Sequence, residues 1–333
     1  MLTLTDNATR RDFLRSLAAL SMPVLSNLQA ESTVNPAATE AQIGGAIERI
    51  KRGVPGMQTK CSYASIANPT HLVVVLRQTH EFAPSEVLSK RASDQSSASL
   101  PGLDAMRREL LQATVFLRQE VSLKHIFCEA VSADQLPELN SVAAELKTKP
   151  SLARGQELRS RIGVDFWKCE LVASSGLLLH AAESRELNKV VSELSEKGSL
   201  VAKEAQRMSE MKVQLEKQYP RRQDIPEVQQ RAFIEVADRV IKASERFVAF
   251  WNDPLTRQGI FEKRERFALD QMSRLFTAEQ GAPSPTNSCP GAVLLYGGNH
   301  DFKRHLAAIH QQYPTLRVAL IELTPESYRE PPR

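Results

Sequence analysis

Residues 292–323 read AVLLYGGNHDFKRHLAAIHQQYPTLRVALIEL. Two runs rich in Val, Leu and Ile, residues 292–296 and 317–323, lie on either side of a helix pattern that begins after Phe302 and ends near Gln312. Apolar runs without clean alternation are typical of parallel strands that are covered on both faces. The stretch therefore predicts a strand, a turn, a helix and a second strand, which is a βαβ unit with a right-handed crossover.

Two further apolar runs, residues 71–76 (HLVVVL) and 125–131 (HIFCEAV), are predicted to be strands of the same sheet. The middle of the chain differs, because residues 151–279 show no pattern that predicts a strand. Long amphipathic helix patterns occupy residues 187–219 and 226–251. We predict an α/β fold with a largely parallel sheet and a long all-helical insertion between the second and later strands. An all-helical bundle is the alternative, and the strand pairs near both ends of the chain argue against it.

These patterns divide the chain into one discontinuous domain with a leader. Residues 31–44 (ESTVNPAATEAQIG) are small and polar, which indicates a linker. The predicted parts are a signal peptide at 1–30, a linker and N-terminal segment at 31–69, a first part of the α/β core at 70–150, a helical insertion at 151–280 and a second part of the core at 281–333.

The composition is that of a soluble globular protein. Of the 333 residues, 42% are hydrophobic and 25% are charged, which argues against intrinsic disorder. Lys and Arg number 43 and Asp and Glu number 39, and an excess this small gives no reason to expect nucleic-acid binding. No run approaches the roughly 18–20 apolar residues of a membrane span, so no integral span is expected in the mature protein. The four cysteines are scattered and form no CxxC pair.

The N-terminus carries a basic segment followed by an apolar one. Arg10 and Arg11 precede Phe13 and Leu14, and the run SLAALSMPVL follows Arg15. This order resembles the twin-arginine (Tat) export signal, with cleavage after Ala30. The resemblance implies the Tat export machinery as a partner and a periplasmic or other extracytoplasmic location. An amphipathic N-terminal helix is the alternative interpretation.

Three chemically useful side chains lie where predicted strands end. His80 follows the run 71–76, Glu129 lies within IFCEAV, and His300 ends Gly297-Gly298-Asn299-His300 after the run 292–296. Ligands bind beyond the carboxyl ends of the strands in open parallel sheets, so these residues are predicted to converge. Two imidazoles and a carboxylate suit a divalent metal with an open position, or the activation of water. Gly297 and Gly298 would let the backbone approach a ligand. Ordinary loop histidines are the competing interpretation, whereas a carboxylate within an apolar run is costly unless it is paired or bound.

The same layout resembles the superfamily that joins erythromycin esterases, ChaN-type haem-binding lipoproteins and TraB/Tiki/GumN proteins. Its pattern is a strand ending in Gly-x-x-His, a strand carrying Glu, a helical insertion and a second Gly-x-x-His. The resemblance implies that His80, Glu129 and His300 are catalytic or metal-ligating. The segment RERFAL resembles the Arg-Asn/Asp-x-x-Met/Trp-Ala segment of that superfamily, which implies that Arg264 binds a ligand together with Gly297 and Gly298.

The first motif departs from the superfamily pattern. Arg77 stands where Gly is expected, and Gln78 stands where many members have Glu. A neutral amide cannot act as a carboxylate base and is a poor metal ligand. A member that depended on that acid would therefore be impaired, and the site would then serve binding alone.

Three functional hypotheses remain open from the sequence. The first is an exported, metal-dependent hydrolase-like protein that acts on an ester or peptide bond. The alternative is a non-catalytic protein of the cell envelope that binds haem, a metal or a small molecule. A third hypothesis is an envelope scaffold whose long helices at 187–251 mediate assembly, although the apolar stripes of these helices also suit an ordinary core.

Overall fold

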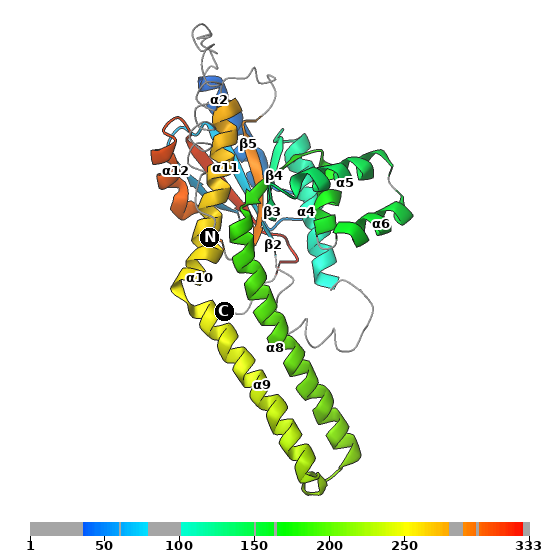
Figure 1. Ribbon diagram of the computed structural model, residues 1–333. Helices are drawn as coiled ribbons and strands as arrows, with labels where there is room; N and C mark the ends of the chain where they lie inside the picture. The colour runs from blue at the N-terminus through cyan, green and yellow to red at the C-terminus, as the bar shows by residue number, and fades with distance from the viewer. Residues whose placement is uncertain are drawn as a thin grey trace, which may run out of the picture. The chain divides into compact units, whose positions relative to one another are not determined.

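The structure of the protein is a computed structural model that describes residues 36–59, 61–78, 101–149, 151–162, 165–279, 289–297 and 300–328. The predicted export signal at 1–30 lies outside these residues, as do His80 and Gly298. Figure 1 shows a sheet with helices packed around it and a long pair of helices that extends from it.

One sheet of six strands forms the centre of the described chain. Its spatial order is β1-β6-β2-β5-β3-β4. The strands are β1 (Ser62–Ser65), β2 (His71–Gln78), β3 (His125–Ser132), β4 (Leu178–Glu183), β5 (Gly291–Gly297) and β6 (Val318–Leu323). Neighbours from β6 to β4 are parallel, and β1 pairs antiparallel with β6 at one edge. The predicted α/β class is confirmed, and all four predicted strands are present. Because β2 lies between β5 and β6, the two strands of the predicted βαβ unit are not neighbours.

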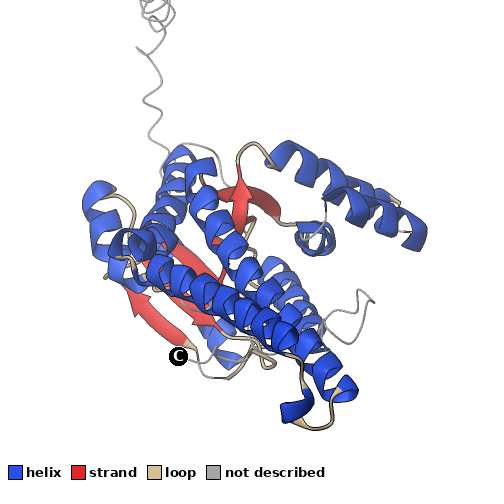
Figure 2. Ribbon diagram, turned by 60° about the horizontal axis from the view of Figure 1, so that its bottom comes forward, coloured by secondary structure: helices blue, strands red, loops and turns tan. Residues whose placement is uncertain are grey.

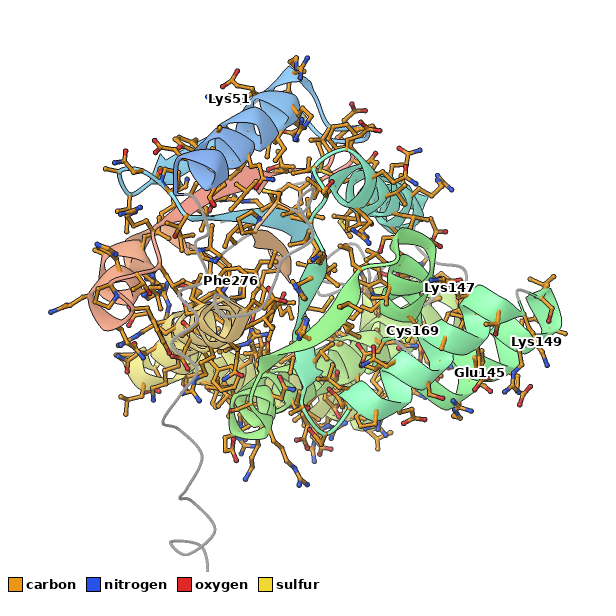
Figure 3. All side chains as sticks on the ribbon, turned by 90° about the horizontal axis from the view of Figure 1, so that it is seen from above. Lys51, Glu145, Lys147, Lys149, Cys169 and Phe276 are labelled. Carbon is orange, nitrogen blue, oxygen red and sulfur yellow. The ribbon has the colours of Figure 1, made fainter. Side chains whose placement is uncertain are left out.

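Helices cover both faces of the sheet, as Figure 2 shows. Alternate strand residues point to opposite faces, so Leu72, Val74 and Leu76 belong to one buried cluster and Val73 and Val75 to another. The first cluster is completed by α2 (Pro36–Arg52), α4 (Pro101–Gln119), α5 (Leu136–Thr148), α6 (Leu152–Ile162) and α7 (Phe166–Ser175). The second is completed by α11 (Arg264–Glu279) and α12 (Leu306–Gln312). Cys169 of α7 and Phe276 of α11, labelled in Figure 3, belong to the two different clusters.

The prediction that residues 151–279 contain no strand is wrong, because β4 lies within them. This strand is only six residues long and pairs with β3 alone. Its sequence, LLHAAE, has two alanines and a histidine where a buried strand usually has branched residues, so its pattern resembles a short helix. The insertion is therefore not all-helical, and it contributes one strand to the sheet.

The predicted linker at 31–44 is wrong from Pro36 onward. Residues from Pro36 form α2, whose apolar side chains Ile43, Ala46, Ile47 and Ile50 are buried in the first cluster. Small polar residues begin this helix, so its first turns resemble a linker in composition. The apolar positions that pack on the sheet begin only at Ile43.

Two long helices, α8 (Arg185–Gln218) and α9 (Glu227–Asn252), form an antiparallel hairpin that Figure 1 shows running away from the sheet. Ser184 caps α8, because its side chain accepts a hydrogen bond from Leu187 N at 3.2 Å. Arg239 of α9 forms an ion pair with Glu204 of α8 at 3.2 Å. Both predicted long helices are thus present, joined by a turn that includes η2 (Arg222–Asp224).

The chain returns to the sheet through α10 (Pro254–Gln258) and η3 (Gly259–Lys263) and continues directly into α11. Asp253 caps α10 by accepting a hydrogen bond from Thr256 N at 2.7 Å, and Pro254 occupies a first-turn position that tolerates it. The segment η3 is a π-helical turn, and such turns are frequent at functional sites. Among the described helices, none has the length and apolar character needed to cross a membrane.

Candidate functional site

Four strands deliver polar groups to the carboxyl edge of the sheet. Gln78 ends β2, Glu183 ends β4 and Gly297 ends β5, while Glu129 is the fifth of the eight residues of β3 and follows the last regular pair with β4 at Cys128. The pairing of β3 with β4 shifts register between Cys128 and Ser132. A bulge of this kind redirects side chains and is common beside active sites.

A strained backbone accompanies the bulge of β3. Ala130 has a φ of 61°, a left-handed conformation that non-glycine residues adopt only at an energetic cost. Glu129 immediately precedes it and is buried. The Nζ of Lys168 donates to the main-chain oxygen of Glu129 at 2.7 Å, which fixes the bulged backbone from the side of α7.

The carboxylate of Glu129 is held on both oxygens. Its Oε2 accepts hydrogen bonds from Gly297 N at 2.6 Å and from Gln78 Nε2 at 3.0 Å. Its Oε1 accepts a hydrogen bond from Arg264 Nη2 at 2.8 Å. The Gln78 side chain therefore has a clear role, because an amide donates to Glu129 where a carboxylate at position 78 would repel it.

Arg264 is the first residue of α11 and is buried between two carboxylates. Its Nε donates to Glu183 Oε1 at 2.9 Å, and Nη2 contacts both Glu183 and Glu129. The guanidinium also lies 5.9 Å from the centre of the Tyr296 ring. Glu183 Oε2 is buried and has no hydrogen-bond partner among the described residues. These two carboxylates raise the pKa of Arg264 above its usual value, although burial opposes this.

His300 lies between Glu265 and Glu129. Its Nδ1 is 3.1 Å from Glu265 Oε1, and its Nε2 is 3.4 Å from Glu129 Oε1. The ring is enclosed by aromatic neighbours, with ring centroids 4.9 Å away for Tyr296 and 5.3 Å away for Phe261. The Nδ1 contact is the shorter one, so Glu265 sets the orientation of the imidazole and leaves Nε2 more loosely held.

Glu265 is fully buried and accepts hydrogen bonds on both oxygens. Oε1 also accepts one from Asp301 N at 3.1 Å. Oε2 accepts one from Arg304 Nη2 at 2.7 Å and lies 2.8 Å from His305 Nε2. Burial opposes ionisation, but the hydrogen bonds from His300, His305 and Arg304 outweigh it and hold the pKa of Glu265 well below its usual range.

The cluster contains as many cations as carboxylates when His300 is protonated. The carboxylates are Glu129, Glu183 and Glu265, and the cations are Arg264, Arg304 and His300. Burial disfavours the imidazolium, but hydrogen bonds to Glu129 and Glu265 outweigh burial and raise the pKa of His300 above its usual value.

This raised pKa predicts a pH-dependent stability difference between the wild type and a His300→Gln variant. A raised folded-state pKa stabilises the fold fully below the unfolded value of 6.5, and that stabilisation is lost as pH rises through the folded-state pKa. We expect the free-energy difference to be largest near pH 5–6 and to shrink towards pH 9. Urea unfolding at several pH values measures it, with His310→Gln as the control, and a difference that does not vary with pH would contradict the assignment.

The structure brings together four of the six site residues that the sequence predicts: Glu129, His300, Arg264 and Gly297. His80 and Gly298 lie outside the described residues, so their place in the site stays a prediction. The sequence analysis missed Glu183 and Glu265. Glu183 ends the strand that was not predicted. Glu265 is adjacent to Arg264 in RERFAL, and in such a charge-rich helix the sequence does not distinguish a buried acid from an exposed one.

The described residues do not fit a divalent metal in their present arrangement. Arg264 occupies Glu129 Oε1, and a metal ion at that oxygen would be repelled by the guanidinium. Both nitrogens of His300 face carboxylates in the arrangement of an imidazolium, which has no lone pair to donate. Within the described ranges, no three His, Cys, Asp or Glu side chains are grouped so that they could hold a metal ion.

The arrangement is suited to proton transfer. A carboxylate holds Nδ1 of an imidazole while Nε2 faces a second buried carboxylate, so a proton has two adjacent sites that it can occupy. The buried surroundings strengthen each electrostatic contact.

No protein-family model, curated protein or solved structure matches this chain.

Proposed function

We propose that this chain is an exported hydrolase-like protein that cleaves an ester or peptide bond at the carboxyl edge of its sheet. One observation carries the proposal: His300 connects two buried carboxylates, because Glu265 holds its Nδ1 and its Nε2 faces Glu129. Export is inferred from the twin-arginine segment at Arg10 and Arg11.

Glu129 and His300 would share the proton transfers of hydrolysis. Oε1 of Glu129 takes a proton from water as the water oxygen attacks the carbonyl carbon, and Nε2 of His300 gives a proton to the leaving oxygen or nitrogen. The carboxylic acid product keeps the oxygen of the attacking water. The proton on Glu129 then crosses the 3.4 Å to Nε2, which restores both groups. Glu265 fixes the imidazole, and Arg264 balances the carboxylate charge.

The direct test is an assay of purified protein against a panel of aryl esters and short peptides. Glu129→Gln and His300→Gln are each expected to lower the rate by roughly 10²–10⁴-fold, the usual contribution of general acid–base catalysis. His310→Gln, which alters a histidine of α12, is the control. Rates unchanged in both site variants would overturn the proposal.

The predicted metal is tested in the same assay with a chelator. Activity that persists in the chelator supports the metal-free chemistry described above. Activity that is lost in the chelator, restored by a divalent cation and absent from His80→Ala would instead support the metal role that the sequence predicts for His80.

A non-catalytic binding function is the second candidate, and the contacts of Glu129 Oε2 favour it. Gly297 N and Gln78 Nε2 already hold this oxygen, so less of the carboxylate is open to a reacting molecule. The expected result is then no hydrolysis by the wild type across the whole panel. A haem titration with a change in the Soret band would identify the haem-binding version of this function.

A further inference from the structure

A cleft is formed by residues of α4, α5 and α7, the helices that complete the first buried cluster. Its volume is about 500 Å³, which lies within the roughly 300–1,000 Å³ of small-molecule sites. The lining shares no residue with the candidate site at the carboxyl edge of the sheet. It combines apolar side chains with several cations, and Lys147, one of these cations, is labelled in Figure 3.

Helix α7 presents one side to this cleft. Trp167, Leu171 and Ser174 follow one another at steps of four and three residues, so they lie in line along the helix. Leu111 of α4 and Leu146 of α5 extend the apolar lining from the two neighbouring helices. The indole of Trp167 packs against the first cluster and is only half-buried, so part of its surface faces the cleft.

Three cations join these apolar groups: Arg107 and Arg108 of α4 and Lys147 of α5. Arg107 already has partners, because its guanidinium lies 5.7 Å from the centre of the Trp167 ring and 4.0 Å from the carboxylate of Asp104. Arg108 and Lys147 are exposed, and neither forms an ion pair with a carboxylate of the described residues. These two side chains are therefore available to a ligand.

The charge of the lining is positive. Glu170 is the one acid among the lining residues, and burial raises its pKa, although Arg159 and Arg107 oppose this. Even when Glu170 is ionised, Arg108 and Lys147 outnumber it. This excess favours an anion over a neutral or cationic molecule.

We propose that the cleft binds a small aromatic carboxylate, with its ring against Trp167 and its carboxylate held by Arg108 and Lys147. A carboxylate accepts hydrogen bonds from both a guanidinium and an ammonium group. A planar ring suits the apolar part, because it extends the stack that the guanidinium of Arg107 forms with the indole. This binding is independent of the proposed hydrolysis.

The first test titrates the purified protein by calorimetry with naphthoate and, separately, with the neutral naphthamide. The wild type is expected to bind the carboxylate about 10-fold more tightly than the amide, the effect of two partly exposed ion pairs. Arg108→Gln/Lys147→Gln is expected to bind both compounds with the same affinity and to keep its helical content.

The matched control is Lys149→Gln/Arg266→Gln, which also removes one lysine and one arginine, both exposed and outside this cleft. The control is expected to retain the preference for naphthoate. A wild type that binds neither compound, or binds both equally, would overturn the proposal. A preference that survives in Arg108→Gln/Lys147→Gln would do the same, because the anion would then bind elsewhere.

The second test measures the charge around Trp167 without any ligand. The chain has two tryptophans, so Trp251→Phe leaves Trp167 as the sole indole. Iodide and caesium ions both quench indole fluorescence on contact, and a positive cleft concentrates iodide. At constant ionic strength, the ratio of iodide to caesium quenching is expected to fall when Arg108→Gln and Lys147→Gln are added. An unchanged ratio would contradict the proposed role of these two cations.

Discussion

Replacing Arg264 with Met is expected to lower the free energy of unfolding by about 3–5 kcal/mol, because it leaves buried carboxylates without their cation. Glu183 loses the guanidinium that occupies its Oε1, and its Oε2 already has no hydrogen-bond partner among the described residues. Glu129 is affected less, since Gly297 N and Gln78 Nε2 still hold its other oxygen. Urea unfolding of the purified variant at neutral pH measures the loss.

Two further variants show whether the loss comes from the unpaired charge. Arg266→Met removes an exposed arginine two positions along the same helix and should change stability by less than about 0.5 kcal/mol. Adding Glu183→Gln to Arg264→Met removes the unpaired carboxylate and should recover part of the loss. An Arg264→Met variant as stable as the control would contradict the charge network described here.

Replacing Glu265 with Gln is expected to lower the rate of hydrolysis by roughly 10²–10⁴-fold. His300 then loses the carboxylate that orients its ring and stabilises its protonated form. Glu265 touches no substrate in the proposed reaction, so it is a positioning residue that acts through the imidazole. With one carboxylate removed, the pKa of His300 falls, since burial opposes the imidazolium. The part of the pH–rate profile that reports His300 should shift to lower pH.

Glu262→Gln is the matched control for this prediction. Glu262 is half-exposed, lies three residues before Glu265 and contacts Arg304 at 3.4 Å, so it shares a partner but not the contact with His300. NMR titration of the His300 ring follows its protonation without any substrate. A Glu265→Gln variant that loses activity while the pKa of His300 stays unchanged would mean that Glu265 acts only on the fold.

Glu129 and His300, at the centre of the site, could be predicted because each stands out from the sequence around it. Glu129 interrupts an apolar strand, and a buried carboxylate there requires a partner. His300 follows a strand and two glycines, a position where parallel sheets bind ligands. Arg264 came from a family resemblance rather than from its own pattern, since arginines are common on charged helices.

The residues that the sequence analysis missed depend on distant parts of the chain. Glu183 lies in β4, whose alanines and histidine do not favour a strand by themselves. These residues form a strand because they pair with β3. Glu265 is buried because the π-helical turn η3 and α11 bring it against His300 and Arg304. The local sequence distinguishes neither side chain from the exposed glutamates of the neighbouring helices.

The order of strands also determines when the protein can acquire its site. Strand β2 is made early, yet its neighbours are β5 and β6, and Leu72 pairs with Gly291 near the far end of the chain. Sheets joined by such distant pairings close slowly, because a long loop must be ordered before any pairing forms. During synthesis, β2 must remain without these partners until β5 and β6 have left the ribosome. The buried charges of Glu129 and Arg264 are 135 residues apart, so a fragment that ends before α11 would carry this carboxylate without the guanidinium that neutralises it.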